Sequence, residues 1–218
     1  MDYQWLGLQD FETMFREQKQ SLMWAPEREV VWGLEHPPVI TLGRRARMQD
    51  ELPETFDDIP VVVTDRGGLA TLHSPGQLVI YPLISIARRQ WGPRDYVCQL
   101  LKITKQCLQE MGIDGQVDEA QSGLFVGSNK ICFVGLRVSS GRVYHGLSLN
   151  VSNDLMLFDR IRSCGLQRRP MTSLRALGVN ASPEEVYRRW VLVARDSGRF
   201  NLAETWPEKD SFHCQSDK

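Results

Sequence analysis

Residues 123–151 read GLFVGSNKICFVGLRVSSGRVYHGLSLNV, three apolar runs separated by the polar stretches GSN and SSGR. Short runs rich in β-branched and aromatic residues, bounded by Gly, Ser and Asn, are typical of strands joined by tight turns. The stretch therefore predicts a meander of three antiparallel strands over residues 123–127, 130–138 and 143–151.

The same criteria predict further strands with the sequences VVWGL (30–34), PVITLG (38–43), IPVVVTD (59–65) and GQLVIYPLI (76–84). Apolar residues at helical spacing predict a helix over residues 10–24 and a second one that opens at Pro93 and stops at Gly112. A third helix begins with the capping box of Ser182 and Glu185 and runs to about Arg195. Since helices flank strands that are mostly linked by hairpins, we expect an α+β domain with a mixed, largely antiparallel sheet.

Length and composition limit the class of protein. A chain of 218 residues with 42% hydrophobic and 24% charged residues fits one domain over residues 1–218, with a core at about 8–202 and a polar tail at 203–218. The net charge of −1 gives no overall signal for binding nucleic acid or an anionic membrane. No apolar run is long enough to cross a bilayer and the first ten residues have no targeting pattern, so we expect a soluble, cytoplasmic protein.

The cysteines are odd in number and widely spaced, which argues against a disulfide framework or a structural metal site. Two of them, Cys98 and Cys107, fall on the second predicted helix, and Cys214 lies in the polar tail. Cys132 and Cys164 remain as candidates for chemistry. Cys164 stands in IRSCGLQRRPMTSL (161–174), among several arginines, and on these residues alone it is either a buried apolar filler or a nucleophile.

A glycine pair follows the strand that ends at Asp65. Two adjacent glycines, Gly67 and Gly68, allow backbone angles closed to other residues and let a ligand lie against the main chain. Arg66 beside them offers a fork of donors to a carbonyl or a phosphate. An ordinary turn explains the pair equally well, and the loop matches neither the dinucleotide nor the P-loop pattern.

An ordered set of short motifs runs over about residues 30–178. They are EHPPVITLG (35–43), DRGG (65–68), His73 with PGQ (75–77), Lys130-Ile131, Gly135, His145-Gly146, Asn150-Val151, and Cys164-Gly165 followed by MTSL. In this order the set resembles the lipoyl(octanoyl) transferase family. The resemblance implies the fold of biotin and lipoate protein ligases. It also implies transfer of an octanoyl group from acyl carrier protein to a lysine of lipoyl-accepting domains, such as those of 2-oxo acid dehydrogenases and the glycine cleavage H protein.

The resemblance implies that Cys164 and Lys130 are the catalytic pair and that no cofactor or metal is needed. It places substrate contacts on Arg66, Gly67, Gly68, Leu69, Ala70, Thr71, Leu72, His73, Phe133, Val134, Gly135, His145, Gly146, Leu147 and Ser148. Plain sheet structure is the alternative for these stretches, and a solvated turn lysine is the alternative for Lys130.

The implied pair is chemically consistent. Attack on a thioester needs a thiolate, and an ammonium within about 4–6 Å favours the anion. In the second half of a ping-pong reaction the acceptor amine must lose a proton, and a deprotonated Lys130 is a suitable base.

The sequence departs from the family pattern at Leu72, Ser74 and Phe133, where an aromatic residue, a glycine and a smaller residue are usual. We therefore expect acyl transfer with an acyl chain length that the sequence does not fix. The alternatives are an ATP-dependent lipoate–protein ligase and a non-catalytic module that binds acyl carrier protein or lipoyl domains. Because acyl carrier proteins are acidic, the predicted docking patch is either the cluster Arg44, Arg45 and Arg47 or the pair Arg88–Arg89.

Overall fold

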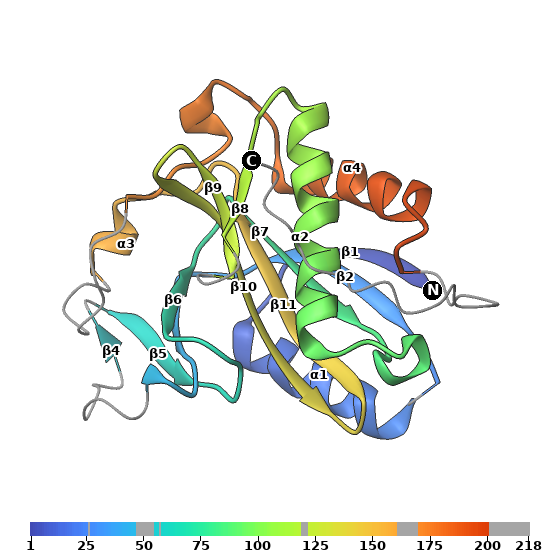
Figure 1. Ribbon diagram of the computed structural model, residues 1–218. Coiled ribbons are helices and arrows are strands. Elements are labelled where there is room, and N and C mark those ends of the chain that lie inside the picture. Colours follow the sequence, from blue (N-terminus) through green and yellow to red (C-terminus); the bar gives the residue numbers. More distant parts are fainter. Residues whose placement is uncertain (26, 47–54, 57, 119–121, 161–169, 201–218) are drawn as a thin grey trace.

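A seven-stranded sheet runs through the centre of the molecule in the order β1-β2-β7-β11-β10-β9-β8 (Figure 1). The computed structural model describes residues 1–200 except 26, 47–54, 57, 119–121 and 161–169. The strands are β1 (Asp2–Leu8), β2 (Val30–Glu35), β7 (Gln77–Leu83), β8 (Gln116–Asp118), β9 (Gly123–Val126), β10 (Asn129–Ser139) and β11 (Arg142–Asn150). Strands β1 and β2 pair in parallel and the other neighbours are antiparallel, so the predicted mixed, largely antiparallel sheet is confirmed.

The predicted meander is formed by β9, β10 and β11. The turn between β10 and β11 consists of Ser140 and Gly141, which have φ of 48° and 73°. Positive φ at both central residues is the geometry that lets a two-residue turn follow the twist of the strands. The SSG sequence thus fixes the register in which Gly135 lies opposite Gly146.

Helices cover both faces of this sheet. On one face α2 (Pro93–Glu110) and α4 (Pro183–Asp196) enclose the main core, which includes Leu100, Trp190 and Ile80 (Figure 1). On the other face α1 (Phe11–Trp24) packs Met14 against Val79 and its neighbours. The alternation of Val79 and Ile80 between the two faces is the period of two that a strand covered on both sides requires. All three predicted helices are confirmed.

A second, four-stranded sheet lies next to β10 of the first. Its order is β4-β5-β3-β6, with β3 (Val39–Leu42), β4 (Thr55–Phe56), β5 (Ile59–Val63) and β6 (Ala70–His73). A separate apolar cluster joins it to β10 and to the short helix α3 (Leu157–Arg160); it contains Leu72, Phe133 and Phe158. Two 3-10 turns, Ala87–Arg89 and Arg175–Leu177, complete the elements.

Four strands, β1, β4, β6 and β8, are not among those predicted, and β4 and β8 have only two and three residues. Strand β1 is a half-exposed edge strand whose register shifts between Trp5 and Leu8, so it carries little apolar alternation. Strand β6 has only four residues, between the glycine pair and the Ser74–Gly76 turn, and it forms because Val39–Leu42 pairs with it. Tertiary pairing decides both, not local pattern.

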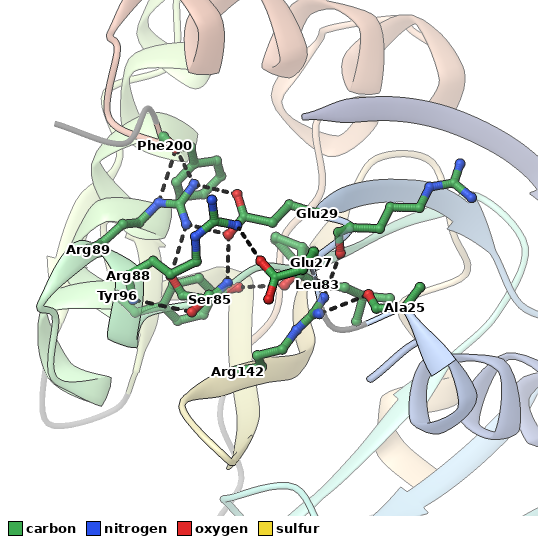
Figure 2. Close-up of polar contacts among 12 residues, drawn as sticks. Ala25, Glu27, Glu29, Leu83, Ser85, Arg88, Arg89, Tyr96, Arg142 and Phe200 are labelled. Carbon is green, nitrogen blue, oxygen red and sulfur yellow. Dashed lines mark hydrogen bonds and ion pairs between the residues drawn. The ribbon is translucent and has the colours of Figure 1, made fainter. Parts of the chain in front are cut away.

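A buried polar cluster ties the end of the described chain to the sheet (Figure 2). Arg89 donates to both carboxylate oxygens of Glu29, at 2.6 and 2.8 Å, and also to the carbonyl oxygen of Phe200. Arg89 is 5% exposed, so the prediction that it belongs to a docking patch is wrong. Its neighbour Arg88 is exposed and lies 3.5 Å from Glu27.

Candidate active site

Lys130 is the second residue of β10, and its side chain is buried. The residue is 8% exposed, and Nζ lies 4.9 Å from the ring centre of Phe133 and 5.4 Å from that of Phe125. An ammonium over aromatic faces is stabilised electrostatically, more strongly where water is excluded. The burial rules out the alternative of a solvated turn lysine.

The side chain of Lys130 crosses Gly123 of the adjacent strand. A Cβ at position 123 would lie 2.5 Å from Lys130 Cε and 2.3 Å from the carbonyl oxygen of Cys132. Glycine is thus required at position 123 for the lysine to lie flat against β9. The register shift between Lys130 and Cys132 in the same pairing turns the lysine out of the regular alternation.

Cys164, the other member of the predicted pair, lies outside the described residues. Residues 170 and 172, which follow it in sequence, are hydrogen-bonded to both backbone groups of Lys130. The Lys130 N–H donates to the carbonyl oxygen of Pro170 at 2.9 Å, and the Thr172 N–H donates to the carbonyl oxygen of Lys130 at 3.0 Å. On the preceding side, the ring of Phe158 stacks on Phe133 with centres 5.6 Å apart and planes at 8°.

Cys132 is a structural residue. It is fully buried in the main core, and burial raises the pKa of its thiol to about 12. Because the thiolate is the nucleophilic form, this thiol is unreactive near neutral pH. Of the two candidates left open by the sequence, Cys132 is the filler.

His73 lies in a buried network near the same end of β10. Its Nδ1 is 2.7 Å from Gln77 Oε1, Gln77 Nε2 donates to Asn150 Oδ1 at 3.0 Å, and Asn150 Nδ2 donates to the carbonyl oxygen of Thr172 at 3.0 Å. Burial, with the neighbouring His36 adding to it, lowers the pKa of His73 to about 3, so its ring is neutral. Gln77 and Asn150 belong to the motifs on which the family resemblance rests, but the sequence predicted no role for either.

His36 is structural, as its place between a strand and Pro37 suggests. Its Nδ1 donates to the carbonyl oxygen of Gln9 at 2.7 Å, so Nε2 accepts from the Tyr81 hydroxyl at 2.8 Å. Burial lowers its pKa to about 4.

The Arg66 guanidinium is held rigidly beside the glycine pair. It is 7% exposed and donates to the hydroxyl and carbonyl oxygens of Thr41 and to the carbonyl oxygen of Gly67. Burial lowers its pKa to about 10, and no carboxylate among the described residues forms an ion pair with it. Gly135 gives this arginine room, because a Cβ there would lie 3.2 Å from Arg66 Cδ and 3.3 Å from the Gly67 carbonyl oxygen, tighter than an ordinary van der Waals contact.

His145 of β11 lies opposite Leu136 of β10, next to the Gly135–Gly146 pair. Its Nε2 lies 2.9 Å from Asp65 Oδ1, and the Tyr144 hydroxyl donates to the other oxygen of Asp65 at 2.5 Å. Burial would raise the pKa of Asp65, but these hydrogen bonds outweigh it and hold the pKa well below its usual range. Burial lowers the pKa of His145 although Asp65 opposes the shift.

The predicted site residues therefore form two groups along β10. His145 pairs with Leu136, which lies about 20 Å along the strand from Lys130. Lys130, His73, Leu72 and Phe133 mark one end, while Arg66, Gly67, Gly135 and His145 mark the other.

Other predicted contact residues have a clear structural position. Leu147 and Val134 pack with the main core beneath α2 and α4, on the face opposite Phe133. Gly146 lets β7 approach, because a Cβ there would lie within 2.0 Å of the Ile80 carbonyl oxygen. Ser148 is buried opposite Phe133. The remaining predicted residues, Gly68, Leu69, Ala70 and Thr71, lie in the glycine loop and in β6.

The fold and this arrangement define a class of protein. Residues 12–193 match the family model of the lipoyl protein ligase A/B catalytic domain. The structure of a lipoate protein ligase described as putative, from T. acidophilum with bound lipoic acid, superposes with a TM-score of 0.72 at 14% identity, over 90% of this chain and 85% of that one. The chain belongs to the lipoyl protein ligase A/B catalytic-domain family and has its fold.

Closer relatives place it within that family. An octanoyltransferase from Magnetococcus marinus is 46% identical over 72% of this chain and 73% of its own length. An octanoyltransferase from Laribacter hongkongensis is 39% identical over 85% of this chain and 90% of its own length. The chain is a member of the octanoyltransferases, which are acyltransferase enzymes.

Proposed function

We propose that this protein moves an octanoyl group from acyl carrier protein to a lysine of a lipoyl domain, in the cytoplasm, through an acyl-enzyme on Cys164. The domains of 2-oxo acid dehydrogenases and the glycine cleavage H protein are the proposed acceptors. The observation that carries the proposal is Lys130: a buried amine whose backbone pairs with Pro170 and Thr172, a few residues after Cys164 in sequence.

In the first half of the reaction the Cys164 thiolate attacks the carbonyl carbon of the donor thioester. A new carbon–sulfur bond forms, the bond to the carrier sulfur breaks, and the carrier leaves as a thiolate that takes up a proton. The Lys130 ammonium favours the attacking thiolate by charge and is a proton source for the leaving one.

In the second half the acceptor lysine amine attacks the acyl-enzyme. A carbon–nitrogen bond forms, the bond to Cys164 breaks, and the amine proton passes to Lys130. One thioester replaces another in the first half and an amide replaces a thioester in the second, so the second half drives the sequence. Burial of Lys130 beside two aromatic rings keeps bulk water from competing for this proton.

Octanoyl-carrier protein docking is assigned to Arg44 and Arg45. Both are exposed, and their backbone N–H groups bond the carbonyl oxygens of Arg66 and Gly68 at 3.0 and 3.2 Å. Two positive charges fixed on the predicted acyl-binding loop suit an acidic carrier. Arg47 lies outside the described residues.

Intact-mass measurement after incubation with octanoyl-carrier protein tests the acyl-enzyme. Wild type and the control Cys98→Ser, which changes a partly exposed thiol on α2, should gain one octanoyl mass, and Cys164→Ser should gain none. An adduct that persists in Cys164→Ser, or that is missing from wild type, contradicts the proposal. Modification of a lipoyl domain by free octanoate and ATP, without carrier, would identify a ligase instead.

A further inference from the structure

Asn150 is a junction between three parts of the chain near Lys130. It is the last residue of β11, is fully buried, and pairs in register with Gln77 at the start of β7. Its side chain donates to the carbonyl oxygen of Thr172 at 3.0 Å, and its own carbonyl accepts from the Leu174 N–H at 3.1 Å. Asn150 therefore holds the segment 172–174 at both ends.

The orientation of each amide in this network is determined by its neighbours. A backbone carbonyl only accepts, so the Asn150 group facing Thr172 is the NH2, and Oδ1 is left to accept from Gln77 at 3.0 Å and from Asn153 at 3.2 Å. The Gln77 NH2 also donates to the carbonyl oxygen of Leu72 at 3.3 Å, which leaves Gln77 Oε1 to accept from His73 Nδ1. The hydrogen bonds thus run in one direction from His73 to Thr172.

Thr172 connects this hydrogen-bond network to Lys130. Its N–H donates to the carbonyl oxygen of Lys130 and its own carbonyl oxygen accepts from Asn150 Nδ2 at 3.0 Å, so the two backbone groups of Thr172 connect Asn150 to the lysine backbone. A displacement of about 1 Å in a catalytic group costs rate far more than it costs stability.

We infer that Asn150 is a positioning residue for octanoyl transfer, which holds the Pro170–Thr172 segment and Lys130 in reactive register. This inference rests on the proposed role of Lys130. Asn150 itself touches no substrate in this scheme. It acts through the hydrogen bond from Nδ2 to Thr172.

Two variants isolate that bond. Asn150→Leu keeps the branched heavy-atom skeleton and removes all side-chain hydrogen bonding. Asn150→Asp keeps the shape: its carboxyl donates to Thr172 when protonated and cannot when ionised. Burial against a carbonyl oxygen favours the neutral acid, so the activity relative to wild type should fall as pH rises through the carboxyl's pKa. His73, through Gln77, and Lys130, through Thr172, face this position in wild type as well, so the ratio to wild type cancels their titration.

Thr104→Val is the matched control. It removes two buried hydrogen bonds, to Leu100 and from Trp190, between α2 and α4 and away from β10. We expect Asn150→Leu to lower kcat for transfer about 10- to 100-fold, with KM within about twofold of wild type. Thr104→Val should lose comparable stability and keep wild-type kcat.

The inference is overturned if folded Asn150→Leu keeps kcat within about twofold of wild type, if Thr104→Val loses as much kcat, or if the Asn150→Asp ratio stays flat from about pH 6 to about pH 9. If Asn150→Leu does not fold, the pH profile of Asn150→Asp decides. The mass test separates the two proposals. If wild type gains no octanoyl mass, the acyl-enzyme scheme is wrong. If wild type gains the octanoyl mass and the Asn150 variants keep wild-type kcat, only the positioning role of Asn150 is wrong.

Discussion

Replacing Arg89 by methionine should destabilise this protein severely while leaving its chemistry untouched. The two side chains of the Arg89–Glu29 pair are 2% and 9% exposed, so the change leaves a buried carboxylate that still accepts a hydrogen bond from the Ser85 N–H but has lost its ion-pair partner (Figure 2). Arg89→Met also removes the donors to the Ser85 and Phe200 carbonyl oxygens. Removing one partner of such a pair costs about 3–5 kcal/mol.

For a chain of this size that loss corresponds to a fall in Tm of about 6–20 °C. Urea unfolding of Arg89→Met, followed by circular dichroism, measures the free energy directly. Arg88→Met is the control: Arg88 is exposed and lies 3.5 Å from an exposed Glu27, so its loss should cost less than about 1 kcal/mol. The double variant Arg89→Met/Glu29→Leu should regain part of the loss, because no unpaired charge remains.

The pH dependence gives an independent check. Burial would raise the pKa of Glu29, but the hydrogen bonds from Arg89 and from the Ser85 N–H outweigh it, and the net pKa is lowered. A carboxyl with a lowered folded pKa stabilises the protein above its unfolded pKa, and this stability is lost as pH falls through the folded pKa. Wild type should therefore lose this stability in acid, and Arg89→Met should not. A loss below about 1 kcal/mol in Arg89→Met, or a double variant less stable than the single one, would refute the reasoning.

The remaining predictions concern transfer. Lys130→Met should lower kcat for octanoyl transfer at least about 100-fold, because the proposed proton acceptor is lost. It should not lower the urea midpoint of unfolding, since burying an ammonium costs stability; a destabilised but active variant would contradict this. Phe133→Leu removes the ring stacked on Phe158 and should raise kcat/KM for longer acyl chains relative to octanoyl in a competition assay; an unchanged ratio would show that Phe133 does not limit chain length. Arg44→Glu/Arg45→Glu should raise KM for octanoyl-carrier protein and flatten its salt dependence, with kcat and the KM for the lipoyl domain unchanged; Arg88→Glu is the charge-matched control.

The meander was predictable because its signals are local. Ser140 and Gly141 adopt positive φ, a conformation that glycine allows at little cost, and the strands they join are fixed in register by that turn. The capping box of Ser182 and Glu185 is equally local, and α4 begins where it stands. Strand β6 has no such signal, since its pairing partner lies about thirty residues earlier in the chain.

The sequence does not show which of two residues of the same type is buried and which is exposed. Arg88 and Arg89 are identical in sequence terms, yet one is exposed and the other buried against Glu29, because the 3-10 turn at Ala87–Arg89 points them apart. Cys132 and Cys107 likewise differ from a reactive cysteine only in burial, which the fold supplies. Composition and spacing identify the residue type, and only the tertiary environment sets its charge and reactivity.

The burial of Lys130 supports the catalytic role proposed for this residue. A lysine on a strand ordinarily extends its amine to solvent, and desolvating an ammonium is unfavourable. Here the absence of a side chain at Gly123 leaves room for the lysine to lie against β9, and the amine lies over two aromatic rings. A sequence selected for stability alone would place an apolar residue at position 130. Glycine would still be needed at position 123, because a Cβ there would also lie 2.3 Å from the Cys132 carbonyl oxygen. Retaining a desolvated ammonium at position 130 costs stability, and the proton transfer proposed for Lys130 gives a reason for that cost.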